Sequence, residues 1–132
     1  MDQRLANQRP VIFVVDDDAA VRRALEFSLD LEGFEVETFE SGEALLLRDP
    51  PTFPGCLVID ERLPGISGLE TLRQLRSRRV DLPALLVTSH PKPLFRVQAS
   101  AFGAPILEKP LLGETLAAAI RTEIAAAAAE RA

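Results

Sequence analysis

The chain of 132 residues lacks tryptophan and tyrosine, and it contains one cysteine, Cys56, and one histidine, His90. A single cysteine excludes an internal disulfide and a cysteine-rich zinc site, and it fits a reducing compartment. No apolar run reaches membrane-spanning length, and residues 1–9 lack the apolar core of a secretory signal peptide. These absences predict a cytoplasmic protein that has no membrane segment.

Positive charge is also scarce, because 15 lysines and arginines face 20 acidic residues and the net charge is −5. A protein built around nucleic-acid contacts needs a clustered basic surface, so we expect no direct nucleic-acid binding by this domain. One basic run could contact nucleic acid, but we interpret it as a solvated helix face. It consists of Arg73, Arg76, Arg78 and Arg79.

What the sequence does contain is a regular alternation of short apolar runs and segments with helical periodicity. The apolar runs predict strands over residues 11–15, 34–39, 56–59, 84–87 and 104–107. The periodic segments predict helices over residues 19–32, 41–48, 67 onward, 91–102 and 111–129. Three of the strand runs are apolar throughout, as in a parallel sheet that is buried on both faces.

This alternation predicts an α/β fold, a doubly wound five-stranded parallel sheet with helices on both faces. Apolar residues make up 47% of the chain, enough for one buried core. We place the domain at residues 11–124, after an N-terminal tail of residues 1–10. The alanine-rich helix end, residues 125–132, is either a partner-binding helix or a strong helix former that leads into a linker.

Polar residues follow four of the predicted strands at the point where each strand ends. Asp16, Asp17 and Asp18 follow the first strand, Asp60 the third, Thr88 the fourth and Lys109 the fifth. The carboxyl ends of parallel strands share one rim of the sheet, where such folds bind their ligands. We therefore expect these side chains to form one small pocket, except that Asp18 is better placed to cap the following helix.

Three crowded carboxylates, those of Asp16, Asp17 and Asp60, repel one another, and a hard divalent cation such as Mg²⁺ would relieve that repulsion. Without the cation, at least one of the carboxylates should have a raised pKa. A carboxylate can attack phosphorus as a nucleophile. Lys109 can supply a cation and Thr88 a hydroxyl donor for the oxygens of a transferred phosphoryl group.

Four separated strings carry a resemblance to a known family: VVDDD, LVIDERLPGISGLE, VTSH and EKP. In this order they resemble the receiver domain of bacterial two-component response regulators. Within that family the chain most resembles receivers of nitrogen-fixation-type regulators, which precede a LuxR-type output domain. The resemblance covers residues 11–124. It implies a flavodoxin-like sheet of strand order 2-1-3-4-5 and a sensor histidine kinase or phosphotransfer protein as partner.

The resemblance also implies a role for several pocket residues. Asp60 would be the phosphoacceptor, and Asp17 and Asp60 would bind Mg²⁺ directly, with Asp16 binding it directly or through water. The backbone carbonyl of Arg62 would complete the metal site. Thr88 would move toward the phosphoryl group.

Other features implied by the resemblance lie at the end of the last strand and beyond it. Lys109 would pair with the phosphoryl group, and its peptide bond to Pro110 would be cis. The surface formed by the fourth helix, fifth strand and fifth helix would bind a partner or a second copy of the chain. Phosphorylation would shift the domain between two conformations. Such a domain is not an enzyme, since it catalyses only its own phosphoryl transfer and autodephosphorylation.

The chain departs from the family pattern at three places. Ile106 stands at the switch position where many relatives have a ring that rotates inward, so switching through a ring is in doubt. Pro91 and Pro93 lie where the fourth helix usually begins, and they predict an irregular or mobile helix there. Glu61 adds a negative charge directly after the acceptor, where an uncharged residue is commoner.

Two side chains flank the pocket at positions that tune phosphoryl lifetime in the family. Arg62 and His90 could restrict or position the attacking water, although His90 taken alone is more readily interpreted as a solvated loop histidine.

Three other functions can be set against a phosphorylated receiver. A receiver-like interaction module that is never phosphorylated would have the same fold. An aspartyl-phosphate phosphatase would need a second aspartate, but Asp60-Glu61-Arg62 lacks it. A dinucleotide-binding enzyme would need a glycine-rich turn after the first strand, where three aspartates stand instead.

Overall fold

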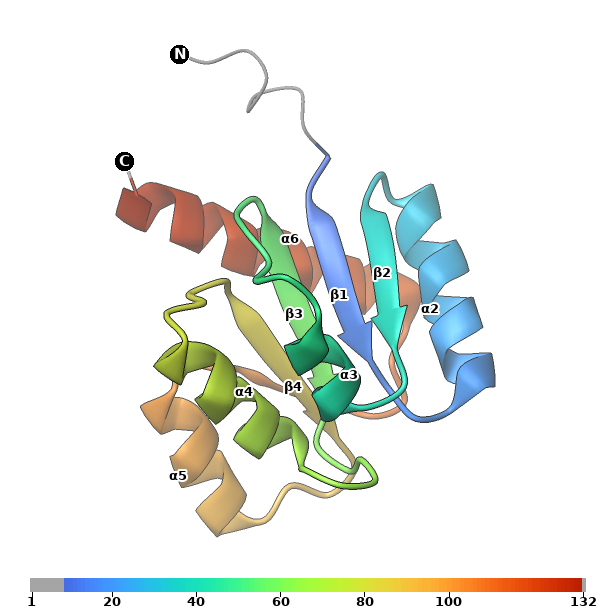
Figure 1. Cartoon of the computed structure of the whole chain (residues 1–132). Helices are drawn as coiled ribbons and strands as arrows, with labels where there is room; N and C mark the ends of the chain where they lie inside the picture. Colours follow the sequence, from blue (N-terminus) through green and yellow to red (C-terminus); the bar gives the residue numbers. More distant parts are fainter. Residues whose placement is uncertain (1–8, 132) are drawn as a thin grey trace.

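The computed structural model describes residues 9–131, which form a five-stranded parallel sheet flanked by helices (Figure 1). The strand order is β2-β1-β3-β4-β5, which confirms the predicted fold class and topology. The strands are β1 (Val11–Val15), β2 (Glu35–Phe39), β3 (Gly55–Asp60), β4 (Ala84–Thr88) and β5 (Ile106–Glu108). The helices are α2 (Ala19–Leu31), α3 (Gly42–Leu47), α4 (Gly68–Ser77), α5 (Pro93–Ala101) and α6 (Gly113–Arg131).

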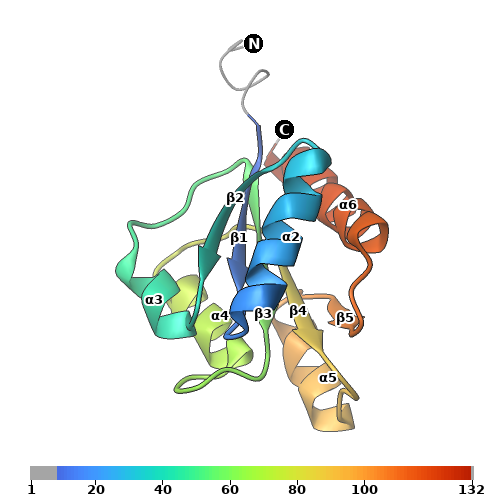
Figure 2. The ribbon, with the colours of Figure 1, turned by 90° about the vertical axis from the view of Figure 1, so that its right-hand side faces the viewer.

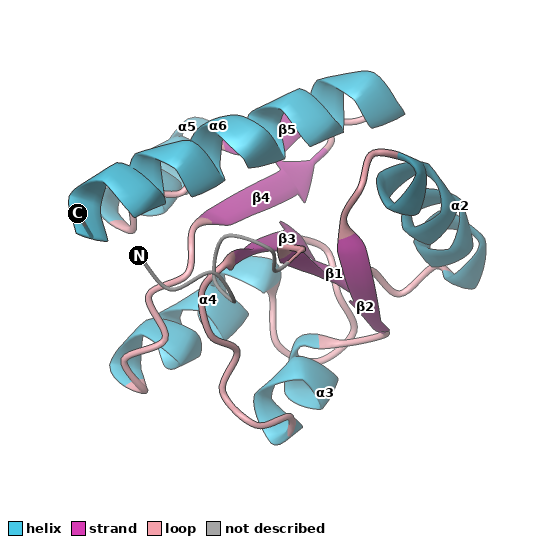
Figure 3. Cartoon of the chain, turned by 90° about the horizontal axis from the view of Figure 1, so that it is seen from above, coloured by secondary structure: helices cyan, strands magenta, loops and turns pink. Residues whose placement is uncertain are grey.

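The helices divide into two layers because successive side chains of each strand point to opposite faces of the sheet. Phe13 and Val15 of β1 lie in the core beneath α3, α4 and α5. Ile12 and Val14 of the same strand lie in the core beneath α2 and α6. Figure 3 shows α2 and α6 on one side of the sheet and α3 and α4 on the other. Both faces of the central strands are therefore covered, as their unbroken apolar runs predict.

Side-chain caps define the starts of three helices. The Asp18 carboxylate accepts hydrogen bonds from the backbone N–H groups of Ala20 and Val21, as predicted. Ser41 and Ser67 cap α3 and α4 in the same way. The sequence also predicts a reciprocal capping box between Ser67 and Glu70, but the Glu70 carboxylate pairs with Arg73 instead.

The described backbone contradicts the predicted irregularity of the fourth helix, whereas its mobility stays a prediction. This helix, α5, is regular, but it begins at Pro93 rather than at residue 91. A proline at the first helical position costs nothing, because its missing N–H would have no partner within the helix.

Two further boundaries differ from the prediction. The strand β5 begins at Ile106, because the N–H of Ala104 bonds to Ala99 and closes the helix α5. The helix α6 begins at Gly113, and Leu111 packs against the core from the preceding loop.

Both described ends of the chain lie at one end of the domain. Figure 2 shows the start of β1 and the end of α6 at the end opposite the carboxyl ends of the strands. Arg131 anchors the last turn of α6, since its guanidinium stacks on Phe53 and pairs with Asp81. Arg9 bonds to the carbonyl oxygens of Gly33 and Phe34 before β1. Between residues 9 and 131, no helix combines the length and the hydropathy that crossing a bilayer requires.

Candidate functional site

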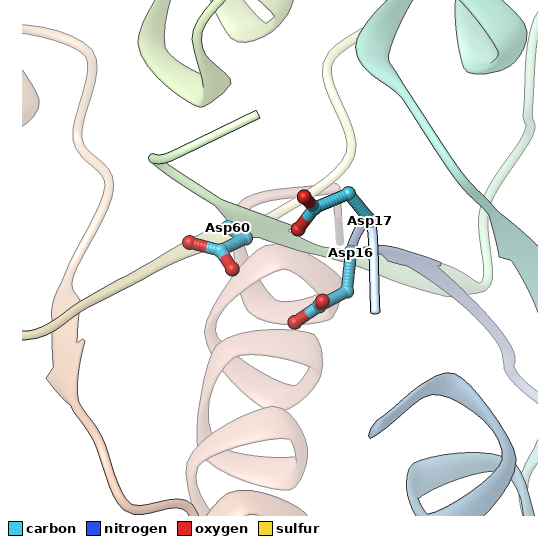
Figure 4. Close-up of side chains that lie close together, drawn as sticks. All are labelled: Asp16, Asp17 and Asp60. Carbon is cyan, nitrogen blue, oxygen red and sulfur yellow. The ribbon is translucent and has the colours of Figure 1, made fainter. Parts of the chain in front are cut away.

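Three aspartates meet where β1 and β3 end. Asp16 and Asp17 follow the last residue of β1, and Asp60 is the last residue of β3. Each can place a carboxylate oxygen within 4.8 Å of the others, and Figure 4 shows the three side chains gathered at the ends of the two strands. Asp16 and Asp60 are buried, whereas Asp17 is exposed. The topology thus brings together the acidic residues that the sequence analysis selected.

Both oxygens of the Asp60 carboxylate have a hydrogen-bond partner. The backbone N–H of Arg62 donates to Oδ1 at 3.1 Å. The ammonium group of Lys109 donates to Oδ2 at 2.7 Å, and it lies 4.0 Å from Oδ2 of Asp16. Lys109 reaches the pocket from the loop after β5, and its peptide bond to Pro110 is cis. Lys109 is thus the cation that faces the buried carboxylates.

The loop that carries Asp16 is held at three points. Asp16 accepts a hydrogen bond at Oδ1 from the N–H of Asp18, and its own N–H donates to Phe39 at 3.1 Å. The guanidinium of Arg22, on the first turn of α2, donates to the Asp16 carbonyl oxygen at 2.6 Å. The sequence analysis missed Arg22. Its position four residues after the Asp18 cap, facing back toward the start of the helix, is the signal that could have identified it.

Burial and charge shift two pKa values in the pocket. The pKa of Asp16 is raised above 3.8, mainly by burial and further by the negative charge of Asp60, although the N–H of Asp18 opposes the shift. Burial alone would lower the pKa of Lys109, but the hydrogen bond and charge of Asp60 outweigh it and raise that pKa. A pocket that disfavours a bare carboxylate at Asp16 favours a bound cation, as carboxylate crowding predicts.

Thr88, the last residue of β4, is buried beside this pocket. Its hydroxyl donates to the carbonyl oxygen of Ser89 at 3.3 Å, and its own carbonyl accepts from the N–H of Lys109 at 2.9 Å. Thr88, Arg62 and His90 line a hollow of about 220 Å³, where Arg62 and His90 are exposed. His90 has a left-handed backbone, with φ of 50°. None of these three side chains donates a hydrogen bond to the Asp60 carboxylate, whose described partners are the backbone N–H of Arg62 and the ammonium group of Lys109.

Glu61 has contacts that the sequence analysis did not anticipate. Its N–H continues the sheet by donating to Val87, and its carbonyl accepts from the N–H of Gly68 at 3.1 Å. Its carboxylate accepts from the N–H of Leu69 at 2.8 Å. Burial raises the pKa of Glu61, the bond from Leu69 opposes this, and the charge of Asp60 adds to the rise. Glu61 therefore joins the end of β3 to the first turn of α4.

The residues present fit a hard divalent cation. The cluster offers carboxylate oxygens only, from two buried aspartates and one exposed aspartate. Mg²⁺ prefers oxygen ligands and retains several waters, so it suits a site that is open on the side of Asp17. Zinc would favour histidine or cysteine ligands, and the described cluster contains neither.

Comparison with known proteins agrees with this geometry. The family model for the response regulator receiver domain matches residues 12–121. The chain therefore belongs to the family of response regulator receiver domains, as its sequence motifs predict. The predicted domain limits at residues 11 and 124 lie close to the matched range but stay predictions.

Named relatives are regulators rather than enzymes. The transcriptional regulatory protein FixJ of Bradyrhizobium diazoefficiens is 40% identical over 114 residues, which are 86% of this chain and 56% of FixJ. The regulatory protein DctD of Pseudomonas aeruginosa, whose name refers to C4-dicarboxylate transport, is 40% identical over 83% of this chain and 24% of its own length. The chain thus spans about half or less of these relatives.

Among solved structures, a CheY-like receiver domain from Methanospirillum hungatei has a TM-score of 0.86 and 25% identity. The match covers 93% of this chain and 99% of that structure. A complete receiver domain thus superimposes on nearly the whole of this chain, which supports the assignment of the fold.

Proposed function

We propose that this domain is a phosphorylation switch in which Asp60 accepts a phosphoryl group from a sensor histidine kinase or phosphotransfer protein. The observation that carries the proposal is the Asp60 carboxylate, buried at the end of β3 between Lys109 and two further carboxylates. A buried nucleophile beside a cation suits attack on an electron-poor phosphorus.

Mg²⁺ would be held by the carboxylates of Asp17 and Asp60, by Asp16 directly or through water, and by the carbonyl oxygen of Arg62. When bound, the ion neutralises charge on the transferred phosphoryl oxygens. The raised pKa of Asp16 supports this assignment, because burial and, to a smaller extent, the charge of Asp60 both disfavour its bare carboxylate.

In the transfer step an Asp60 oxygen forms a bond to phosphorus while the phosphorus–nitrogen bond of a phosphohistidine breaks and the imidazole leaves. Lys109 stays close enough to pair with the new phosphoryl oxygens, and the Thr88 hydroxyl can turn from Ser89 to donate to them. In dephosphorylation a water oxygen forms a bond to phosphorus and loses a proton while the bond from phosphorus to the Asp60 oxygen breaks, which releases inorganic phosphate and restores the carboxylate. Arg62 and His90, which border the adjoining hollow, would then set the rate at which water reaches the phosphorus.

The output surface is proposed to be formed by α5, β5 and α6. Leu94 and Val97 of α5 are 68% and 67% exposed, so this face offers apolar side chains to a partner or to a second copy of the chain. Ile106, at the switch position on β5, pairs with Leu86 of β4 and is half-buried. Because Ile106 has no ring to rotate, the motion of Thr88 must reach this face by another route.

We further propose that the domain acts in the cytoplasm, where the phosphodonor of a histidine kinase is formed. It would not be an enzyme acting on other substrates, since its only chemistry would be gain and loss of its own phosphoryl group.

The test is the intact mass of the protein after incubation with Mg²⁺ and acetyl phosphate. We expect the wild-type chain to gain one phosphoryl group, and both Asp60→Asn and Mg²⁺ removal by chelation to abolish the gain. Lys92→Gln serves as a matched control, because it removes the other lysine, which is exposed outside the cluster, and it should load normally. A wild-type chain that gains no mass and binds no Mg²⁺ would instead support an interaction module that is never phosphorylated.

A further inference from the structure

We propose that Glu61 is a positioning residue that ties the start of α4 to the acceptor strand and releases it when negative charge is added at Asp60. This inference rests on the proposed function, since it needs a phosphoryl group on Asp60. It offers a route for the signal in a domain whose fifth strand carries Ile106 at the switch position.

The first turn of α4 depends on Glu61 for two of its hydrogen-bond acceptors. The first N–H groups of a helix have no partner within the helix. Those of Gly68 and Leu69 donate to the carbonyl and to the carboxylate of Glu61, while that of Glu70 donates to the Ser67 hydroxyl. Loss of the carboxylate contact leaves the Leu69 N–H without its acceptor, so Glu61 controls how firmly the helix begins.

The backbone brings α4 unusually close to the acceptor. A Cβ atom added at Gly68 would overlap the carbonyl oxygen of Asp60, so only glycine fits there without a shift of the chain. The first turn of α4 is therefore packed on the residue that would receive the phosphoryl group. A change of charge at Asp60 therefore changes the electrostatic potential at the first turn of α4 over a short distance.

The direction of the coupling follows from charge. In its bound position the Glu61 carboxylate is half-buried directly after Asp60, where screening by water is weak. An aspartyl phosphate carries more negative charge than the carboxylate it replaces. Repulsion is smaller when the Glu61 side chain turns into solvent, so loading shifts the population toward the released state.

Glu61 also lies between two hollows of the surface. On one side it borders the hollow that contains Thr88, Arg62 and His90. On the other side it borders a groove of about 440 Å³ between α4 and α5, together with Arg73 and Gln98. Release of Glu61 would therefore alter the groove between these two helices as well as the first turn of α4.

The experiment measures amide hydrogen exchange at Leu69 by NMR in the presence of Mg²⁺, with and without beryllium fluoride as a mimic of the phosphoryl group. In the wild-type chain we expect loading to speed exchange at Leu69 by about tenfold. Glu61→Gln keeps an acceptor oxygen but has no charge, so Leu69 should stay protected in both states. Glu61→Ala should exchange fast in both states.

Glu70→Gln is the matched control. It removes an equal charge from the residue after Leu69, which takes no part in the hydrogen bond between Glu61 and Leu69, so this variant should respond like the wild type. Equal Leu69 exchange in loaded and unloaded wild type, or a Glu61→Gln variant that responds as the wild type does, would overturn the inference. Acetyl phosphate loading of each variant, read by intact mass, separates the two proposals. A wild type that never loads would overturn the proposed function itself, whereas loading without a change at Leu69 would overturn only the role of Glu61.

Discussion

Two regions of the domain, each made of strand and helix, differ in how completely they are buried and in how their helices are capped. All six residues of β3 are buried, whereas the three residues of β5 are half-buried or exposed. The helix α4 begins with a side-chain cap from Ser67 and buries four residues, whereas α5 has no side-chain cap and buries only Ala99. We call the segment formed by β1, β3 and α4 the firm half and the segment formed by α5 and β5 the light half.

This difference suits a switch. The three carboxylates belong to the ends of β1 and β3, so Asp60, the proposed acceptor, lies in the firm half. Thr88 and Lys109 stand where the chain enters and leaves the light half, since one precedes α5 and the other follows β5. Segments with few buried contacts open and rearrange at low free-energy cost. A fixed acceptor and movable partners are what a population shift between two conformations requires.

The largest expected difference between the halves is in the free energy of unfolding that is lost when one apolar side chain of each is truncated. Leu57 of β3 is fully buried, so Leu57→Ala should lower the free energy of unfolding by about 3 kcal/mol, because it leaves a cavity. Ile106→Ala in β5 should cost about 1 kcal/mol, since that side chain is only half-buried. Urea unfolding of both variants measures the two costs, and equal costs would remove the basis for separating the halves.

Lys109 follows β5 and pairs with Asp60 at the end of β3, so it links the two halves. Its loss should slow phosphoryl transfer to Asp60. Lys109→Met removes the only cation bonded to Asp60 among the described side chains. We expect the initial rate of loading from acetyl phosphate to fall by about a hundredfold, as for other preorganised charge contacts in reaction sites. Lys109→Arg should restore part of the rate. Rates that match the wild type in both variants would exclude a chemical role for this contact.

The burial of Cys56 in β3 should make the stability of the fold depend on pH in the alkaline range. Burial raises the pKa of its thiol from 9.0 to about 12, so between these values the folded chain keeps a proton that the unfolded chain loses. Stability should therefore be unaffected below pH 9 and fall above it by about 1.4 kcal/mol per pH unit. Urea unfolding at pH 8, 9 and 10 tests this, with Cys56→Ala as the reference. An identical decline in Cys56→Ala would show that the thiol is not the source.

A side-chain cap added to α5 should have the smallest effect, a modest stabilisation of the light half. Lys92 is the residue before α5 and gives the helix no side-chain cap. Lys92→Asp would accept a hydrogen bond from the first turn and should stabilise the fold by about 1 kcal/mol. Lys92→Ala removes the charge without adding an acceptor and should leave stability nearly unchanged. If both variants behave alike, capping is not what limits α5.

The strand order and the gathering of the three aspartates were predictable from local features. Continuous apolar runs such as Val11–Val15 require cover on both faces, and parallel strands then bring the residues after them to one rim. The starts of α5 and β5 were less predictable, because they depend on how the chain leaves the preceding element. The bond from Ala104 to Ala99 uses an N–H that a strand would otherwise need.

The contact of Glu61 with Leu69 could not be predicted from the sequence, and the contact of Arg22 with Asp16 is signalled only by the position of Arg22 in the first turn of α2. Each links a charged side chain to a backbone group of another element, and neither partner is marked by residue type. The bond between Glu61 and Leu69 exists only because residues 62–67 turn the chain back on β3. The roles assigned to Thr88, Arg62 and His90 stay predictions, since none of these three described side chains donates a hydrogen bond to the Asp60 carboxylate.

The most direct measurement of the central claim, that the light half responds to charge placed in the firm half, is amide exchange across the whole domain in the presence of Mg²⁺, with and without beryllium fluoride. Before loading, we expect the amides of α5 and β5 to exchange about a hundredfold faster than those of β1 and β3. Loading should change exchange in α5, β5 and the first turn of α4, while the protection of β1 and β3 stays the same. Equal protection of the two halves, or a response confined to β1 and β3, would contradict the account.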